Sequence, residues 1–430
     1  MALSWRPAAL MALGLLPGIL LVSWLVVILW TMLVLGCIAV DLVLAASPRQ
    51  ISMERTVAHS VRLSQQTEAT LVLRNVSKRR AKGLLRDAWQ PSAGAATSLH
   101  AIDIAPGSAM RLRTALIPTR RGDRYAEHLT LRLFGPLGFA ARQLTFDAAS
   151  KLRVLPEFKS RQHLPSRLAR LREMDGQSAV QLRGAGTEFD SLRPYVEGDD
   201  VRSIDWRATA RASEVTVRTW RPERDRLVVI VVDTSRTSAP RIGDEPRLDT
   251  FIESALLMGA LASQAGDRVE LLAFDRSVRA HISGHTGPEL MNAFAHATSG
   301  LEPSLIEADW TALVATVRKL VSQRALIVLL SNSDLSSADV GLLPVIGALT
   351  KDHTVVLGRV IDPMTAELAT LRDNSIEVYD AAAAEREAVE LHTAQDILRR
   401  RNVTVVPRLP QELAPALADT YLDLKAAGKL

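Results

Sequence analysis

Three oxygen-bearing side chains follow one another at alternate positions near the middle of the chain: Asp233, Ser235 and Thr237. Carboxylate and hydroxyl oxygens are hard ligands of the kind that Mg²⁺ takes, and this ion often keeps coordination positions open for water or for a partner. The D-x-S-x-T pattern therefore predicts a Mg²⁺ site. The alternative interpretation is an ordinary polar loop that follows a strand.

The residues around this pattern predict where it lies in a fold. Leu227–Asp233 is an uninterrupted apolar run that ends on the aspartate, which is typical of a strand buried on both faces of a parallel sheet. A second apolar run, Ala325–Leu330, is followed by three polar residues and Asp334. Open α/β sheets place their ligand sites beyond the carboxyl ends of the strands. We therefore expect Asp233 and Asp334 to share one oxygen-lined site.

Strands and helices alternate over the rest of this half of the chain. Short apolar runs predict further strands at 269–274, 278–282, 354–360 and 403–406, the second of them as an antiparallel edge strand. Helical periodicity predicts helices at 247–264, 288–299, 310–322, 340–351, 383–401 and 410–427. This alternation predicts a doubly wound α/β domain of the Rossmann type over residues 227–430.

Residues 158–226 are dense in charges of both signs, and we interpret them as a linker that opens with a helix over 159–183. Its acids permit a hydrolase that uses paired carboxylates as general acid and base. They also permit salt bridges and caps that lock the linker onto the α/β domain, with Trp206 packed at the joint. Gly198-Asp199-Asp200 is typical of a turn with a following cap. We favour the second interpretation, and so no enzyme, because no histidine or nucleophile accompanies the acids.

The N-terminal stretch 1–47 predicts a membrane anchor. Residues 8–40 carry no charge, and the apolar stretch of about 39 residues suffices for two spans of about 20 residues each. We expect a transmembrane helical hairpin that reverses either at Pro17-Gly18 or between Trp24 and Trp30. Arginines before and after the stretch (Arg6, Arg49, Arg55 and Arg62) place the soluble part in the cytoplasm. The alternative is one long tilted span with an external domain.

Residues 48–157 predict a small β domain. Strand-like runs at 57–74, 111–117, 128–134 and 139–146 are separated by glycine and proline turns, which indicates an antiparallel β-sandwich. The domain lacks clustered His, Cys or paired carboxylates, so we assign it a spacer or docking role. The net charge of +5 is spread over interleaved acids and bases, which argues against a nucleic-acid partner.

One run in the linker is recognisable. The sequence from Gly184 to Arg211, GAGTEFDSLRPYVEGDDVRSIDWRATAR, resembles the signature of domain-of-unknown-function family fifty-eight. The D-x-S-x-T pattern and the sheet that follow are similar to a von Willebrand factor A domain, which that family carries. The signature residues are Glu188, Arg193, Tyr195, Gly198, Asp199, Asp200, Arg202, Asp205, Trp206 and Arg211.

The resemblance implies a non-enzymatic, multi-pass protein of the bacterial inner membrane, with its soluble domains in the cytoplasm. The family accompanies MoxR-type ATPases of the AAA class, so the resemblance implies an adaptor that binds such an ATPase or its client, besides the lipid bilayer. A divalent ion would bind a partner carboxylate, as in A-type domains.

The A-type resemblance also implies the ligands of this ion. Asp233 and Ser235 match the A-type ligand positions, and Thr237 replaces a serine. Asp334 is displaced from the usual place of the later aspartate, with Asn332 as its possible substitute. Thr311 is the nearest candidate for the threonine ligand. A hydrolase, or a structural membrane protein with a vestigial metal site, stays an alternative.

Overall fold

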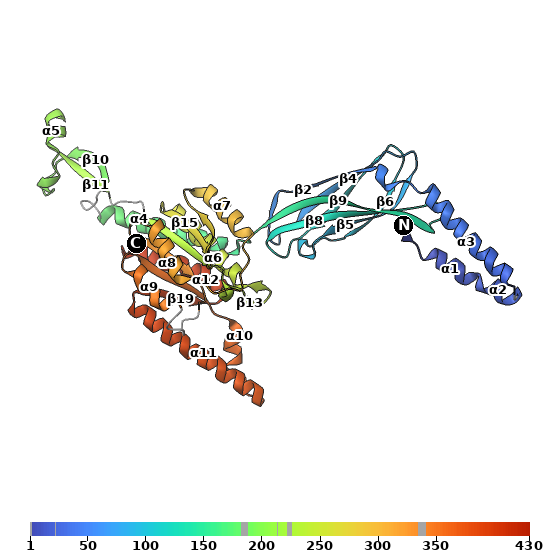
Figure 1. The fold of residues 1–430 in the computed structure, drawn as a ribbon. Coiled ribbons are helices and arrows are strands. Elements are labelled where there is room, and N and C mark those ends of the chain that lie inside the picture. Colours follow the sequence, from blue (N-terminus) through green and yellow to red (C-terminus); the bar gives the residue numbers. More distant parts are fainter. Residues whose placement is uncertain (1, 22, 182–187, 213, 222–225, 334–340) are drawn as a thin grey trace. The chain divides into compact units, whose positions relative to one another are not determined.

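The computed structural model describes residues 2–21, 23–181, 188–212, 214–221, 226–333 and 341–430. Contacts divide the chain into two compact units, Met1–Glu157 and Phe158–Leu430. The first unit contains the N-terminal helices and two β-sheets, and the second contains a mixed α/β sheet and the signature segment. The chain is therefore multidomain (Figure 1).

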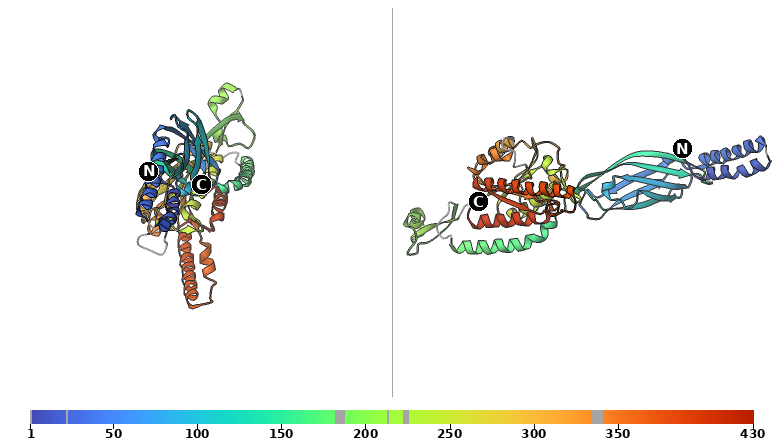
Figure 2. Two further views of the ribbon diagram at one scale, coloured as in Figure 1. Left: turned by 90° about the vertical axis from the view of Figure 1, so that its right-hand side faces the viewer. Right: turned by 90° about the horizontal axis from the view of Figure 1, so that it is seen from below.

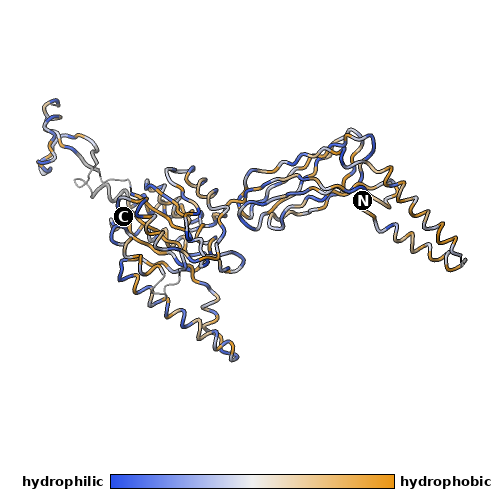
Figure 3. Tube along the Cα trace, viewed as in Figure 1, coloured by the Kyte–Doolittle hydropathy of each residue, from blue (hydrophilic) through white to orange (hydrophobic). Residues whose placement is uncertain are grey.

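Three apolar helices open the first unit: α1 (Arg6–Leu13), α2 (Leu15–Leu21) and α3 (Trp24–Leu44). Figure 3 shows their apolar character. Among the described residues, one helix is long and apolar enough to cross a membrane, with a mean hydropathy of 2.5 from Trp24 to Gln50. The segment Arg6–Leu20 is apolar but shorter.

The helices α1 and α2 run back along α3, so the apolar stretch does form a hairpin (Figure 2). The Trp30 indole donates a hydrogen bond to the carbonyl of Leu10 (2.8 Å). Gly14 lies against the same indole, where a Cβ would come within 2.1 Å of the ring. Both predicted reversal points were wrong. Pro17-Gly18 lies inside α2, and α3 runs unbroken from Trp24, so the chain reverses at neither place.

Two sheets follow in the first unit. The larger has the order β1-β9-β8-β5-β6, with β3 paired in parallel to β9, and the smaller has the order β2-β4-β7. Apolar side chains of both sheets share buried clusters. The strands are β1 (Ala2–Leu3), β2 (Ile51–Val57), β3 (Ser60–Arg62), β4 (Thr67–Asn75), β5 (Ala81–Trp89), β6 (Leu99–Ile104), β7 (Ala109–Leu116), β8 (Gly122–Phe134) and β9 (Ala140–Leu155).

The turn between β8 and β9 holds the end of α3 through one buried carboxylate. Asp41 is fully buried and accepts hydrogen bonds from the backbone amides of Leu137 (2.8 Å), Phe139 (2.5 Å) and Ala140 (3.1 Å). Gly135 permits this approach, because a Cβ there would lie 2.4 Å from the Asp41 carboxylate. Three amide donors satisfy a charge that would be costly to bury alone.

The second unit is built on a six-stranded sheet of order β16-β15-β12-β17-β18-β19. All neighbours pair in parallel except β16, the edge strand that runs antiparallel to β15, as predicted. The strands are β12 (Leu227–Asp233), β15 (Arg268–Phe274), β16 (Val278–Ile282), β17 (Ala325–Leu330), β18 (Thr354–Val360) and β19 (Val403–Arg408). Because β12 and β17 are central, both are buried throughout, and every residue is apolar except Asp233 at the end of β12.

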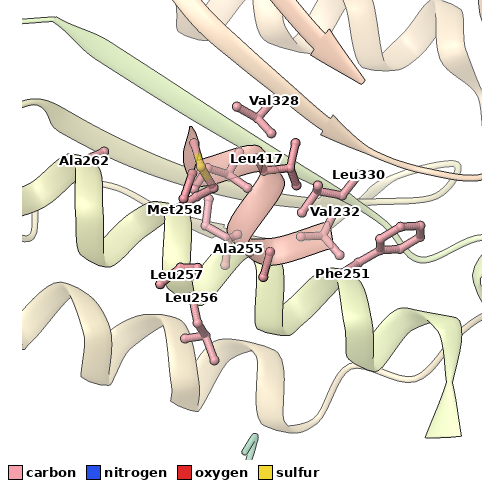
Figure 4. Close-up of a cluster of buried hydrophobic side chains, with 14 of the residues drawn as sticks. Val232, Phe251, Ala255, Leu256, Leu257, Met258, Ala262, Val328, Leu330 and Leu417 are labelled. Carbon is pink, nitrogen blue, oxygen red and sulfur yellow. The ribbon is translucent and has the colours of Figure 1, made fainter. Parts of the chain in front are cut away.

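Helices cover both faces of this sheet. Apolar side chains of α4 (Leu164–Gln181), α6 (Arg247–Gln264), α7 (Gly287–Ser299) and α12 (Pro410–Ala426) pack on one face. Figure 4 shows part of this cluster, in which Phe251 and Leu417 lie against Val232 and Leu330. Side chains of α8 (Trp310–Leu320), α9 (Leu342–Thr350) and α11 (Ser375–Arg400) pack on the other face.

One helix differs strongly from its prediction. We expected a helix from Ala383, but α11 begins at Ser375, where the Asn374 side chain caps it by accepting from the Glu377 amide (3.0 Å). The added turns lack the apolar periodicity used for prediction and expose Ile376 and Tyr379. A short helix α10 (Pro363–Leu368) precedes them. The cap, and not the periodicity, marks the start of α11.

The signature segment forms a small antiparallel module. Strand β10 (Glu188–Pro194) pairs with β11 (Thr216–Arg221), and α5 (Trp206–Ala212) lies between them in sequence. A turn at Gly198, with φ +106°, leads to Asp200, which caps the next turn through the amide of Arg202 (3.0 Å). The predicted turn and cap are confirmed, whereas the two strands and α5 were not predicted.

Candidate functional site

Three neighbouring parallel strands end at the same edge of the sheet in the second unit. The register places Asp233 beside Phe274 and Val232 beside Leu330. The next residues, Asp275 after β15 and Ser331 after β17, therefore lie at the level of Asp233. This is the edge where α/β sheets place ligand sites.

The Asp233 carboxylate gathers hydroxyl groups from two of these strand ends. It is 2 % exposed and accepts from the hydroxyls of Thr237 (2.7 Å) and Ser331 (2.5 Å) on one oxygen. Its other oxygen accepts from the backbone amide of Ser235 (2.8 Å), and the hydroxyls of Ser235 and Thr237 lie 3.2 Å apart. The D-x-S-x-T residues are thus brought together, with Ser331 added to them.

The loop after β17 differs from its prediction in detail. Asp334 lies outside the described residues. Both ends of the Asn332 side-chain amide bond to the backbone of Val360, at 2.7 and 2.8 Å, so its polar atoms are engaged by β18. Ser333 is 3 % exposed, and its buried hydroxyl has no hydrogen-bond partner among the described residues. Ser331 and Ser333 therefore supply hydroxyls where the sequence led us to expect carboxylate or amide oxygen.

Thr311 stays apart from the Asp233 cluster. It lies in the first turn of α8, where Asp309 caps the helix by accepting from the Ala312 amide (2.9 Å). Its side chain is exposed, and within the described part of the chain no hydrogen bond joins it to Asp233, Ser235 or Thr237. Its predicted role as a metal ligand stays a prediction.

Asp275 is a buried acid that the sequence analysis missed. It accepts from the amides of Arg276 (2.6 Å) and Ser277 (3.1 Å), from the Ser304 hydroxyl (3.1 Å) and from the Arg279 guanidinium (3.3 Å). Burial opposes its ionisation, but these donors outweigh burial and hold the pKa of Asp275 below its usual value. The available signal was a strand that ends on an acid, as Leu227–Asp233 does.

The donor set at Asp233 suits a hard divalent cation. It offers carboxylate oxygen and the hydroxyl oxygens of Ser235, Thr237 and Ser331. The unpartnered Ser333 hydroxyl adds a further oxygen at the same loop. In the described ranges no group of three or more His, Cys, Asp or Glu side chains could hold a metal ion, so the oxygens at this site come from one described carboxylate and several hydroxyls. Carboxylate and hydroxyl oxygens are the kind of ligand that Mg²⁺ takes, whereas soft transition metals take thiolate and imidazole.

The signature module holds its charged residues in internal pairs. Arg193 donates to both oxygens of Asp199, at 2.8 and 2.6 Å, and this pairing lowers the pKa of Asp199. Asp205 accepts from the amide of Ala208 (3.0 Å), which lowers its pKa most, and from the Arg218 guanidinium (2.8 Å). Glu188 lies at the start of β10, opposite Arg221 in register. The expected salt bridges are present, but they link parts of the module with one another.

Several apolar residues of the module face solvent. Trp206 is 68 % exposed, and its packing at a joint with the α/β domain stays a prediction. Other exposed signature residues are Tyr195, Arg202 and Arg211. A paired hairpin of this size buries little apolar surface of its own. Exposed aromatic and apolar side chains on it are typical of a contact surface.

Comparison with known proteins places this constellation in a family. The model described as "Protein of unknown function DUF58" matches residues 191–408, over half of the chain. The chain belongs to the DUF58 family. The match begins inside β10 of the signature module and ends at the last residue of β19. The DUF58 region thus contains the Asp233 cluster, Asp275 and most of the signature.

Two curated relatives of this DUF58 chain are described as uncharacterized proteins. Uncharacterized proteins of Mycobacterium tuberculosis and Mycobacterium bovis are 23 % identical to it over 218 residues, which cover 50 % of this chain and 68 % of theirs.

Two solved structures resemble part of the chain remotely. A β-glucosidase from Listeria innocua has a TM-score of 0.17 at 9 % identity, and the match covers 24 % of this chain and 16 % of that one. A complex of zinc 2-glycoprotein and prolactin inducible protein from human seminal plasma has a TM-score of 0.20 at 15 % identity, covering 24 % and 92 %. Likenesses of this size carry no argument about function.

Proposed function

We propose that the chain is a membrane-anchored, non-enzymatic adaptor. In this proposal the first unit combines a two-span anchor with a β-sandwich, and the sheet of the second unit is a von Willebrand factor A-like domain. The domain binds a carboxylate of a protein partner through Mg²⁺ at Asp233. The partner is a MoxR-type AAA ATPase or its client, at the cytoplasmic face of the bacterial inner membrane.

The observation that carries the proposal is the convergence of neutral hydroxyls on one carboxylate. Asp233 is the only acid whose hydrogen bonds are described within the cluster with Ser235, Thr237 and Ser331. With so few negative charges from the protein, bound Mg²⁺ would keep net positive charge and accept an acidic partner group. Asp233 and the hydroxyls would hold the ion, and the two strand ends would fix their spacing.

The alternative of a hydrolase at the signature acids has less support. A general acid that works near neutral pH needs a raised pKa. The pairings of Asp199 with Arg193, and of Asp205 with backbone amides and Arg218, lower the pKa values of both carboxyls. Ion pairs of this kind stabilise the module and keep its acids ionised.

Affinity capture tests the adaptor. The full chain is solubilised in detergent and captured from its own cells with Mg²⁺ or with a chelator, and partners are identified by mass spectrometry. We expect an AAA ATPase with Mg²⁺, and its loss both with chelator and in Asp233→Ala. Asp244→Ala is the matched control, because Asp244 is an exposed acid of the turn between β13 (Arg241–Ile242) and β14 (Glu245–Pro246).

Two results would contradict parts of the proposal. Recovery of the same ATPase with chelator and in Asp233→Ala would move the contact away from the metal site, with the module around Trp206 as the next surface to test. A hydrolytic activity of the purified chain that is lost on changing Asp205 would favour the enzyme.

A further inference from the structure

We infer that the C-terminal end of α3 is encircled by a binding site for anionic phospholipid headgroups. The site is a basic collar formed by Arg6, Arg49, Lys78, Arg79 and Arg142. This inference rests on the part of the proposed function that makes α3 a membrane span. It adds the class of lipid that the anchor selects and the residues that select it.

The first step is the depth of the collar. The 21 residues of α3 extend about 31 Å, close to the thickness of the hydrocarbon core. Arg142 donates to the carbonyl of Leu42 (2.8 Å), and Arg79 donates to the carbonyl of Val43. Both guanidinium groups therefore lie at the last turn of the helix, beside the exposed apolar side chains of Val43 and Leu44. This is the level at which headgroups begin.

The second step is that the turn carrying Lys78 and Arg79 is pre-formed. Asn75, which is fully buried, donates to the carbonyl of Arg79 (2.8 Å) and accepts from the Ser77 hydroxyl (2.7 Å). Ser77 also donates to the Arg79 carbonyl (2.9 Å). Buried polar side chains thus fix the backbone between β4 and β5, while Lys78 and Arg79 stay exposed. A rigid turn loses little conformational entropy when it binds a ligand.

The opposite side of the collar is fixed by the turn between β8 and β9. Arg6 at the start of α1 donates to the carbonyl of Leu137 (2.7 Å), in the turn whose amides hold Asp41. The neighbouring Trp5 is 75 % exposed. Tryptophan beside the end of an apolar helix is typical of the membrane–water interface. The two turns thus hold Arg6 and Arg79 beside the last turns of α3, and Arg49 follows the helix by five residues in the chain.

The third step concerns the positive charge of the collar, which nearby acids among the described residues do not neutralise. Asp41 is engaged by three backbone amides, and Asp103 pairs with Arg80 at 2.6 Å. Within the described residues no ion pair involves the five residues of the collar. Arginine and lysine donate several N–H groups that suit phosphate oxygens. A cluster of basic residues at headgroup depth favours anionic lipid by about fivefold in affinity for each residue.

Lipid titration of the full chain tests the collar. The protein is purified in a neutral detergent, and thermal unfolding and bound lipid are followed on addition of phosphatidylglycerol, phosphatidylcholine or inorganic phosphate. We expect phosphatidylglycerol to bind and to raise Tm, whereas the other two additions have little effect. Arg49→Ala/Lys78→Ala removes two exposed members that make no described side-chain bond to α3, and it should weaken phosphatidylglycerol binding roughly 30-fold.

The matched control is Arg113→Ala/Arg120→Ala. Both residues are exposed in the same unit, and Arg113 lies opposite Thr70, five residues along β4 from Asn75. This control should bind phosphatidylglycerol as the parent does. Equal binding of the two phospholipids, or an unchanged affinity in Arg49→Ala/Lys78→Ala, would overturn the collar and leave the adaptor intact. Equal stabilisation by inorganic phosphate would overturn the lipid as its ligand.

A chain that is recovered outside the membrane fraction would overturn the anchor and the collar together. Failure to capture any Mg²⁺-dependent partner with the parent chain would overturn the adaptor alone.

Discussion

Asp233 and Asp275 occupy nearly the same place in the fold, yet they are surrounded differently. Each lies at the carboxyl end of a parallel strand, β12 for the first and β15 for the second, and each is almost fully buried. Among the described residues, the donors to the Asp233 carboxylate are all neutral, whereas Asp275 also faces the guanidinium of Arg279. A strand-end carboxylate can therefore serve either the fold or a ligand. The two roles differ in whether the protein places a cationic side chain beside the carboxylate.

The first prediction compares what each carboxylate contributes to stability. Asp275→Ala leaves two backbone amides, the Ser304 hydroxyl and Arg279 without their acceptor, so we expect opening of β15 to become easier by about 3 kcal/mol. Asp233→Ala frees hydroxyls that can rotate to other acceptors, so its cost is about half as large. Hydrogen exchange of strand peptides in the full chain measures both costs. Equal costs would remove the distinction between the two sites.

The second prediction concerns the part of the stabilisation by Asp275 that depends on the charge of its carboxylate. Its pKa is lowered from 3.8 in the folded chain, so its stabilisation is complete well above that value and is lost as the pH falls through the lower, folded pKa. In Asp275→Asn, the Tm of thermal unfolding should fall less between pH 6 and pH 3 than it does in the parent. An unchanged fall of Tm in Asp275→Asn would show that other carboxylates cause the acid dependence of stability.

Glu253 of α6 provides a control of opposite sign. Burial raises its pKa above 4.5, although the Ser160 amide donates to it at 2.7 Å. Protonation of Glu253 therefore favours the folded chain as the pH falls through its raised pKa. In Glu253→Gln that gain is missing, so acid should destabilise this variant more steeply than the parent.

The third prediction separates the Asp233 carboxylate from its backbone. Ser331→Ala removes a hydroxyl from the carboxylate, and Ser238→Ala removes one from the Asp233 carbonyl (2.7 Å). Each change should cost about 1 kcal/mol. Only Ser331→Ala should reduce the rise in Tm on addition of Mg²⁺. A reduction of equal size in Ser238→Ala would mean that the ion responds to loop order and not to the hydroxyl.

The fourth prediction has the smallest expected effect. Thr311 is exposed in the first turn of α8 and is not bonded to the Asp233 cluster within the described residues. Thr311→Ala should change stability by less than about 0.5 kcal/mol and leave the response to Mg²⁺ unchanged. A tenfold weaker response to Mg²⁺ would instead make Thr311 a ligand, reached through movement of the loop before α8.

Much of the second unit could be predicted because its central strands are uniformly apolar. The bounds of β12, β17 and β18 agree with the sequence analysis, since turn residues end each run sharply. The start of α11 depends on the Asn374 cap and not on an apolar stripe, so periodicity placed it eight residues late. Strands β5 and β6 escaped prediction because their runs contain Gly83, Asp87 and His100.

The candidate site was predictable only in part. Alternate spacing placed Asp233, Ser235 and Thr237 together, and strand order placed the loop after β17 beside them. That Ser331 contacts the carboxylate depends on a one-residue register between two strands far apart in sequence. Asp275 escaped because only one hydroxyl, that of Ser277, follows it at alternate spacing, although Asp275 directly follows the β15 residue that pairs with Asp233.

The hydrogen bonds of the buried Asp41 carboxylate can form only well after Asp41 itself has been synthesised. Its three amide donors lie 96 to 99 residues further along the sequence, so they are made long after α3 is complete. At ribosomal speeds of about 5–20 residues per second, the carboxylate waits roughly 5 to 20 seconds for its partners. During that interval the helix end keeps its charge in water or at a lipid surface. A stall in translation between residues 45 and 135 would therefore prolong the exposure of this acid at the end of an apolar helix.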